Sequence, residues 1–270
     1  MVYLVRLYLL ICSRFNENGL GHKIIFWTLR PIVSRFKLRY IVDGVHFKLN
    51  PIGYIDSQLI LNNNFDQEVK ELVDNLKEND VFIDIGANFG LFSLLAARKG
   101  AMVVSFEPST RELITFYRNL ELNKNIASKI RIVPMAVGKQ TNDFLSLTYG
   151  PSSNTGTNKI TDGILCDEKI PVVEVGKILG EYYIKKVKLI KIDVEGFELN
   201  VVDSLQDLLI KMSDLHVVCE INNEMPNSEK IFEIFQTCGF ELNNRAHLTN
   251  TVNNAIFYKK GISFILDFYR

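Results

Sequence analysis

The stretch Val81-Phe82-Ile83-Asp84-Ile85-Gly86-Ala87-Asn88-Phe89-Gly90 decides the fold of this 270-residue chain. Its first five residues are mostly apolar, as is typical of a short strand buried in a parallel sheet. Gly86 permits a tight turn and lets the backbone approach a ligand without a Cβ in the way. Gly90 allows the following helix to lie close to the sheet. The stretch therefore predicts a strand, a ligand-binding turn and a helix.

The turn lacks the signatures of phosphate-binding loops. Position 88 is Asn and position 91 is Leu, so the G-x-G-x-x-G dinucleotide pattern is absent, and no P-loop Gly-Lys-Ser/Thr follows. Asp84 suits a cationic ligand better than a pyrophosphate. Glu107 lies 23 residues further on, near the spacing at which an acid binds ribose hydroxyls. Its alternative is a surface acid near a helix N-terminus, but with Asp84 in place a cationic nucleoside is favoured.

Strands and helices are expected to alternate around this turn. We expect strands over residues 81–85, 102–106, 130–137, 187–192 and 215–221, and short late strands over 240–244 and 255–259. We expect helices over residues 65–78, 91–99, 109–123 and 227–237, and one beginning near 196. A β-like unit at 40–50, a turn at 51–54 and a loop-rich stretch around 149–156 complete the pattern. This order predicts an α/β fold with helices on both faces of a mostly parallel sheet and ligands beyond the strands' carboxyl ends.

Charge and cysteine usage restrict the class of protein. Basic and acidic side chains both number 31, so the formal net charge is zero. Residues 1–40 hold seven basic groups and one acid, which leaves a mildly acidic body that argues against nucleic-acid binding. The four cysteines show no paired spacing, so we expect neither a disulfide framework nor a zinc site, and a reducing cytoplasm.

The first 64 residues are expected to form a basic, apolar helical and β extension to a domain over residues 65–270. Basic residues interleaved with aromatic ones in residues 23–40 suit a helix at a membrane surface or against a partner. The alternative is a helix that packs on the protein's own body. The initial apolar run is interrupted by Arg6 and is too short to span a bilayer. No small-residue cleavage site follows it, which disfavours a signal peptide.

Four motifs occur together in a fixed order: Asp84–Gly90 (DIGANFG), Ser105–Pro108 (SFEP), Pro134–Val137 (PMAV) and Lys191–Glu198 (KIDVEGFE). Over about residues 65–245 the chain thereby resembles the FkbM-type methyltransferase family, and KIDVEGFE is the most specific part. The resemblance implies a Rossmann-like methyltransferase fold with a seven-stranded sheet. It also implies S-adenosylmethionine as methyl donor and, usually, O-methylation of a sugar, glycan or other small hydroxylated metabolite.

The resemblance further implies which residues bind the cofactor. It assigns Asp84, Gly86 and Asn88 to the methionine part, Glu107 to the ribose, and Met135 and Ala136 to the adenine. The remaining expected cofactor residues are Ala87, Gly90, Pro108 and Asp193. One departure is visible, because the family's common Leu-Asp-Asp run is replaced by a segment in which Glu174 is the only acid.

The Lys191–Glu198 stretch carries the expected chemistry. Alternation places Lys191 and Asp193 on one face of a strand, where buried charges are costly unless they are paired or functional. A hydroxyl acceptor must lose a proton, so Asp193 and Glu195 are candidate bases, with Lys191 beside them. Glu198 is a candidate acceptor contact. For both glutamates the alternative is a helix-start carboxylate favoured by the dipole.

Further acceptor contacts are expected from the opposite rim and from two loops. Glu220 ends the fifth strand and can bind acceptor hydroxyls. Asn154 and His247 lie in polar stretches that could border the acceptor, or form solvated loops. We expect no metal, since no histidine is placed to help the carboxylates hold one.

Two other function classes are weighed against a methyltransferase. A non-catalytic binding or scaffold protein of the same fold is disfavoured by the intact Asp84, Gly86, Glu107 and Asp193. A nicotinamide-dependent oxidoreductase is disfavoured by the missing dinucleotide pattern and by Asp84. The expected partner is a small hydroxylated acceptor such as a saccharide, and the oligomeric state is left open.

Overall fold

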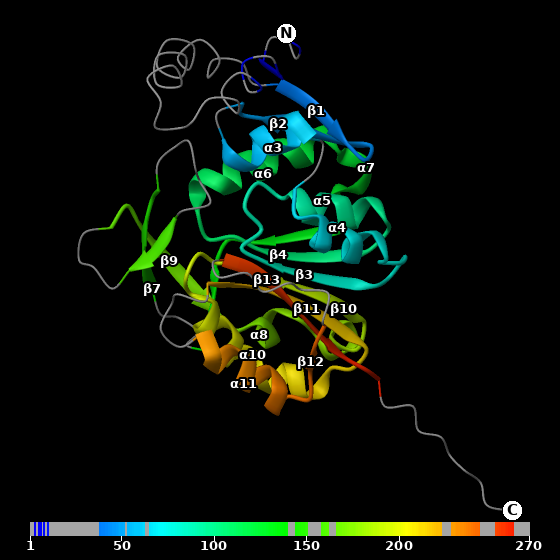
Figure 1. Cartoon of the computed structure of the whole chain (residues 1–270), viewed down its shortest axis with the longest axis vertical. Coiled ribbons are helices and arrows are strands. Elements are labelled where there is room, and N and C mark those ends of the chain that lie inside the picture. Colours follow the sequence, from blue (N-terminus) through cyan, green and yellow to red (C-terminus); the bar gives the residue numbers. More distant parts are fainter. Residues whose placement is uncertain are drawn as a thin grey trace, which may run out of the picture.

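The computed structural model describes residues 3, 5, 6, 8, 10, 38–51, 53–62, 65–139, 144–150, 158–161, 166–222, 228–243 and 252–261. Within them a seven-stranded sheet lies at the centre, with helices on both faces (Figure 1). A four-stranded sheet and a two-stranded hairpin lie at its periphery.

The central sheet has the strand order β12-β13-β11-β10-β3-β4-β5. Its strands are β3 (Val81–Ile85), β4 (Met102–Phe106), β5 (Ile130–Val133), β10 (Val187–Ile192), β11 (Leu215–Asn222), β12 (Glu241–Leu242) and β13 (Val252–Lys259). All neighbouring pairs from β11 to β5 are parallel, and β13 is antiparallel to both β11 and β12. The predicted seven-stranded, mostly parallel Rossmann-like sheet is confirmed. Chain order reverses between β3 and β10, which is where such sheets bind ligands.

Two apolar layers hold helices against this sheet. On one face, Phe82 and Leu189 pack against Leu94 and other residues of the first layer, whereas Ile83 and Ile190 face Leu205 in the second. The helices are α3 (Tyr54–Asn62), α4 (Gln67–Asp74), α5 (Leu91–Arg98), α6 (Thr110–Leu122), α7 (Lys124–Ala127), α8 (Val175–Ile178), α9 (Glu181–Ile184), α10 (Glu198–Lys211) and α11 (Ser228–Thr237). In Figure 1, α4, α5 and α6 lie above the sheet and α8, α10 and α11 below it. Successive side chains of a strand point to opposite faces of the sheet, so each strand contributes apolar residues to both layers.

The predicted strand over residues 130–137 is wrong in its second half. β5 ends at Val133, and β6 (Ala136–Val137) pairs instead with β9 (Glu168–Val173) in the four-stranded sheet. Pro134 has no N–H to donate to a ladder, and the Met135 amide turns back to the Val133 carbonyl at 2.9 Å. The chain therefore leaves the central sheet at Pro134.

The segment after β6 was expected to be loop-rich, and it contains a small sheet of order β6-β9-β7-β8. β7 (Phe144–Thr148) is antiparallel to β9 and to β8 (Lys159–Thr161). Glu168 ties this sheet to the start of α6, because it accepts hydrogen bonds from the Thr110 amide and hydroxyl and from the Tyr149 hydroxyl. The small sheet is thereby fixed beside the carboxyl ends of β4 and β5.

An N-terminal hairpin, β1 (Leu38–Val42) and β2 (Val45–Leu49), packs on α6 through two asparagines. The Asn123 side chain binds both the amide and the carbonyl of His46, at 2.9 and 2.7 Å. Asn119 accepts from the Lys48 amide at 2.9 Å and donates to the Phe89 carbonyl at 3.0 Å. One buried side chain therefore links the hairpin to the turn that follows β3.

The described residues of the first ten also contact the body. Val5 and Tyr8 are buried, and Arg6 donates to the Ile60 carbonyl at 2.9 Å and to the Tyr40 hydroxyl. These residues therefore pack on the protein's own body. Of the amphipathic segment predicted over residues 23–40, residues 23–37 lie outside the described residues, and residues 38–40 belong to β1. Among the helices that are described, none has the length and apolar character needed to cross a membrane.

Candidate active site

A cavity of about 420 Å³ opens at the carboxyl ends of β3, β4 and β10. Its walls come from these strand ends, from the start of α3, from the β5–β6 connection and from the small sheet. Pockets of this size bind small molecules and cofactors. The cavity lies at the reversal of strand order, as the sequence predicts.

The turn after β3 exposes backbone to this cavity because of two left-handed residues. Gly86 has φ of 81°, and a Cβ built there would lie 1.8 Å from the Asp193 carbonyl oxygen. Asn88 has φ of 52°, a conformation that asparagine tolerates better than most residues. Both residues line the cavity. Only a glycine at 86 lets this turn and the end of β10 lie so close together.

Glu107 is held at the end of β4 as a nearly buried acceptor. Its two oxygens accept from the amides of Asn88 and Ser109, each at 2.8 Å. Burial raises the pKa of Glu107 to about 8, against the lowering effect of these two amides. Each carboxylate oxygen keeps a further lone pair for the hydroxyls of a vicinal diol. The geometry fits the ribose role expected for Glu107, with Pro108 beside it in the wall.

The wall beyond Glu107 is largely apolar and comes from the small sheet and from the connection that leads into it. Met135 lies in the β5–β6 connection, and Ala136 and Val137 form β6. Leu147 and Ile160, from β7 and β8 of the same sheet, line the cavity together with Asn158. Such a wall offers apolar surface of the kind that the expected adenine role of Met135 and Ala136 requires. The contribution of β7 and β8 was not predicted from the sequence.

Asp193 follows β10 and is fixed by Lys191. The Lys191 ammonium lies 2.8 Å from Oδ2 of Asp193 and 5.7 Å from the centre of the Phe92 ring. Burial acts to raise the pKa of Asp193, but the charge and hydrogen bond of Lys191 outweigh it and hold that pKa below its usual value. Asp193 is therefore an ionised carboxylate on the cavity wall.

Two further acids gather at Asp193. Glu195 and Glu220 each offer an oxygen, and these lie with one from Asp193 within 4.8 Å of one another. Burial, followed by the charge and hydrogen bond of Asp193, raises the pKa of Glu220 to about 9. Glu195 has φ of 56°, which is a strained conformation for a glutamate and is often found at functional sites. Three carboxylate oxygens this close together are also able to bind a divalent cation. The sequence predicted no metal, because no histidine is placed near these acids.

Another part of the lining comes from the start of α3 and from the residues immediately before α4. Tyr54, Phe65 and Asp66 line the cavity there. Burial raises the pKa of Asp66, which is also influenced by Lys191 and Asp193 and is hydrogen-bonded by Asn254. This part of the lining was not predicted from the sequence, although aspartate, here Asp66, is a residue type favoured immediately before a helix.

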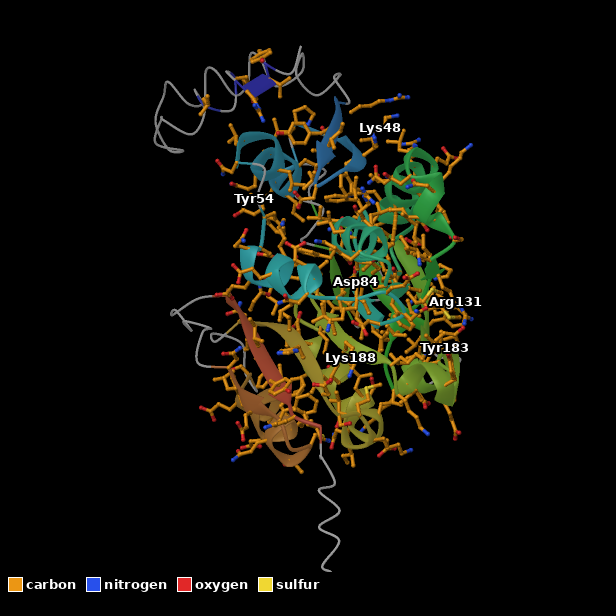
Figure 2. All side chains as sticks on the ribbon, turned by 90° about the vertical axis from the view of Figure 1, so that its right-hand side faces the viewer. Lys48, Tyr54, Asp84, Arg131, Tyr183 and Lys188 are labelled. Carbon is orange, nitrogen blue, oxygen red and sulfur yellow. The ribbon has the colours of Figure 1, made fainter. Side chains whose placement is uncertain are left out.

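Five predicted site residues lie behind the cavity lining: Asp84, Ala87, Gly90, Lys191 and Glu198. Asp84 is buried in β3, where Oδ2 accepts from the Ser93 hydroxyl at 2.5 Å and Oδ1 has no partner among the described residues. Figure 2 shows Asp84 in the interior of the molecule and Tyr54 on α3, nearer the N-terminal hairpin. Burial raises the pKa of Asp84 above its usual value, and its side chain lies behind the site without lining it.

Gly90 and Glu198 instead support the site's backbone. A Cβ on Gly90 would lie 2.2 Å from the Phe116 ring. The absence of a side chain at Gly90 therefore leaves room for Phe116 of α6, whereas the sequence predicted that it leaves room for packing against the sheet. Oε1 of Glu198 accepts from the amides of Val194 and Gly196, at 3.2 and 3.0 Å. This helix-start arrangement, given above as the alternative, corrects the expected acceptor contact of Glu198.

The last three residues considered in the sequence analysis do not line the described cavity. Asn154 and His247 lie outside the described residues. Glu174 precedes α8 and pairs with Lys177 at 3.0 Å, and it is not part of the cavity lining.

Comparison with known proteins agrees with this geometry. The family model described as the methyltransferase FkbM domain matches residues 84–242. Methyltransferase 1 of Beauveria bassiana (strain ARSEF 2860) is 25% identical over 217 residues, which cover 72% of this chain and 86% of that protein. The hexuronic acid methyltransferase AglP of Haloferax volcanii is 26% identical over 156 residues, which cover 57% of this chain and 61% of that protein.

Solved structures are more distant. That of a precorrin-6y C5,15-methyltransferase from Geobacter metallireducens GS-15 is 14% identical, with a TM-score of 0.45, and covers 72% of this chain and 87% of that one. The strand order described above, and not this distant likeness, defines the fold. The family model spans more than half of the chain. The chain therefore belongs to the FkbM methyltransferase family and is an S-adenosylmethionine-dependent methyltransferase.

Proposed function

We propose that this enzyme methylates a hydroxyl group of a saccharide or another small hydroxylated metabolite. The carboxyl groups of Asp193, Glu195 and Glu220 carry this proposal, since they lie together in the lining of the cavity that also holds the residues assigned to the ribose and adenine. Such groups accept hydrogen bonds from hydroxyls and can receive a proton. A relative that is named a hexuronic acid methyltransferase supports a sugar acceptor.

The chain's own residues fit the cofactor. Gly86 and Asn88 would meet its methionine part, Glu107 its ribose, and Met135 and Ala136 its adenine. When bound, S-adenosylmethionine supplies an electrophilic methyl group on a sulfonium. The lining described here contains acids but no lysine or arginine, which suits a cationic cofactor that carries no phosphate.

Proton removal is the task of the acidic end. At neutral pH the high pKa of Glu220 keeps a proton on its carboxyl group, and Asp193 is ionised. We assign Asp193 as the base that receives the hydroxyl proton while the new C–O bond forms. We assign Glu195, which lies beside Asp193, to contact with the acceptor. Lys191 is a positioning residue, because its ammonium holds Oδ2 of Asp193 and does not reach the lining. Alignment of acceptor and methyl group can supply roughly 7–11 kcal/mol of the barrier reduction.

Tyr54 and Phe65 also line the cavity, and their rings offer apolar surface on which the C–H face of a sugar ring can pack. Glu220 is proposed as a hydroxyl contact. Asn154 and His247 stay proposals for the same end of the site.

A labelled-methyl transfer screen over saccharides and hydroxylated metabolites tests this function. We expect transfer to at least one hydroxyl acceptor, and a loss of about 100-fold or more in kcat for Asp193→Asn with cofactor binding retained. Exclusive transfer to nitrogen, or full activity of the Asp193→Asn variant, contradicts the proposal.

We also propose a cytoplasmic protein whose residues 1–40 contact membranes peripherally, on the basis of their excess of basic and aromatic side chains. Co-sedimentation with anionic vesicles, with and without residues 1–40, tests it. Equal pelleting of both forms contradicts the membrane contact.

A further inference from the structure

We propose that Asp66 binds a second hydroxyl group of the acceptor, besides the one that is methylated, so that the acceptor is a polyol such as a sugar ring and not an isolated alcohol. This inference rests on the proposed function and narrows its substrate class. It is drawn from the backbone conformation, the hydrogen-bond partner and the position of Asp66.

Asp66 precedes α4 in a conformation that does not serve the helix. Its φ of 46° lies in the left-handed region, whereas a residue before a helix ordinarily has extended backbone and caps the first turn with its side chain. The Asp66 carbonyl accepts from the Lys70 amide at 2.9 Å, but the Asp66 side chain makes no capping hydrogen bond to α4. Both departures cost stability, and strained backbone of this kind is concentrated at functional sites.

The face of the central sheet that α4 covers holds Asn254 beside Glu220. These two residues lie opposite each other in the antiparallel pair of β11 and β13, so their side chains share one face, with Cβ atoms about 5 Å apart. Val218 and Ile256, two residues away on the same strands, point to that face as well, and they pack in one apolar layer with Val69 of α4. The pair of Glu220 and Asn254 is therefore on the side of the sheet where α4 begins.

Asn254 connects Asp66 to the acids assigned to the acceptor. The Asn254 side chain donates a hydrogen bond to the Asp66 carboxyl group. Glu220, the register partner of Asn254, is hydrogen-bonded to Asp193. Asp66, Glu220 and Asp193 all line the cavity. Asp66 is thereby held in the same part of the lining as Glu220 and Asp193.

A carboxyl group held in this way is suited to a hydroxyl group. A carboxylate offers about four lone-pair sites, so the hydrogen bond from Asn254 leaves others for a ligand. Burial raises the pKa of Asp66, and a protonated carboxyl group still accepts through its carbonyl oxygen. The contact therefore does not depend on the charge of Asp66. With Asp193 at one hydroxyl and Asp66 at another, the acceptor must carry at least two.

The experiment compares methyl hexopyranosides of gluco, galacto and manno configuration with their monodeoxy analogues, each of which lacks one ring hydroxyl. Methyl transfer is measured with the full-length chain and with Asp66→Gly, and cofactor binding is measured by calorimetry. Loss of a hydrogen bond to an acidic group corresponds to roughly 10–100-fold. In Asp66→Gly we expect the KM of the hexoside to rise by about tenfold or more, with kcat and cofactor affinity within about threefold of the wild type.

The deoxy analogues identify the hydroxyl that Asp66 contacts. For the wild type, kcat/KM should fall by roughly 10–100-fold when that hydroxyl is missing. In Asp66→Gly the same analogue should differ from its parent hexoside by less than about threefold, because the contact is already lost. Asp66→Asn keeps an accepting oxygen and should lie between the wild type and Asp66→Gly.

Stability separates a binding role from a structural one. Glycine at position 66 removes the left-handed strain, so the Tm of Asp66→Gly should be unchanged or about 2–4 °C higher. Asp43→Gly is the matched control, because Asp43 has φ of 47°, is exposed in the turn between β1 and β2, and is outside the described cavity lining. This control should leave the KM of the hexoside and the response to the deoxy analogues unchanged.

The outcomes distinguish this inference from the function beneath it. A hexoside KM within about threefold of the wild type in Asp66→Gly, or a deoxy effect that persists in full in that variant, overturns the role of Asp66 and leaves saccharide methylation standing. A fall in Tm of more than about 4 °C with weakened cofactor binding assigns Asp66 to stability and also overturns it. Cofactor binding with no transfer to any of the hexosides overturns the saccharide acceptor and this inference together.

Discussion

Replacement of Gly86 by alanine tests whether the cofactor turn and the catalytic loop form one rigid unit. Gly86 has φ of 81°, and the added methyl would lie 1.8 Å from the Asp193 carbonyl oxygen and 2.8 Å from its carbon. Asp193 cannot retreat freely, because its amide donates to the Ile85 carbonyl at 3.0 Å. The substitution should therefore separate the ends of β3 and β10.

Two costs add in this variant. The left-handed conformation costs an alanine roughly 1–2 kcal/mol relative to glycine. Relief of the overlap with a backbone that cannot move freely costs a further ~1–3 kcal/mol, as in overpacked cores. We expect a loss of roughly 2–5 kcal/mol in the free energy of unfolding, which is a large share of a typical domain's stability.

The measurements are urea unfolding and calorimetric binding of S-adenosylmethionine. Gly180→Ala is the matched control, because Gly180 has φ of −71° and nothing lies within 4 Å of an added Cβ. We expect the control to stay within about 0.5 kcal/mol of the wild type. In Gly86→Ala, displacement by about 1 Å should weaken cofactor binding by about 100-fold. Equal stability and affinity in the two variants would refute the proposed coupling of turn and loop.

Three further predictions concern individual side chains. Because burial raises the pKa of Glu107 to about 8 and a diol binds its ionised form, cofactor affinity should rise up to about tenfold per pH unit from pH ~6 to ~8 and then level off. Calorimetry should show this slope lost in Glu107→Gln, and a slope unchanged in that variant would contradict the ribose role. Glu195→Gly should leave the unfolding free energy unchanged or raise it by about 1 kcal/mol, because the left-handed strain is removed. Its methyl transfer should fall at least about tenfold, and a fully active variant would remove Glu195 from the acceptor site. Asn119→Ala leaves buried backbone groups without partners and should cost about 2–4 kcal/mol in urea unfolding, whereas Asn62→Ala on the exposed surface of α3 should cost under about 0.5 kcal/mol. A rise in the KM for the cofactor but not for the acceptor would distinguish positioning of the turn from general destabilisation.

Local sequence patterns predicted the centre of the site. The strand, turn and helix around Gly86 follow from residues adjacent in the chain, as does the placement of Glu107 and Glu220 at strand ends. Their side chains meet because parallel strands end at one edge. The burial of Asp84 was also predictable from the alternation of side chains along β3, because Asp84 points to the same face of the sheet as Phe82, toward α5. The expected role of Asp84 was inferred from its charge and not from the face of the strand on which it lies.

The ends of the site depend on contacts between distant segments. No residue near Tyr54 or Asp66 in the sequence indicates that these two line the same cavity as Asp193, which is more than 120 residues away. The small sheet was missed because its strands are short and separated by polar stretches rich in turn residues. Pro134 was a readable signal, since a proline inside a predicted strand usually ends its pairing.

Both ends of the cavity include segments outside the parallel sheet. The small sheet between β5 and β10 supplies Leu147 and Ile160, and the start of α3 and the residue before α4 supply Tyr54 and Asp66. The middle, from Gly86 to Glu107, belongs to the sheet itself. The architecture is thus modular: exchange between relatives of the segment that carries Tyr54 and Asp66 would change which acceptors fit while it conserves the scaffold that holds the methyl donor.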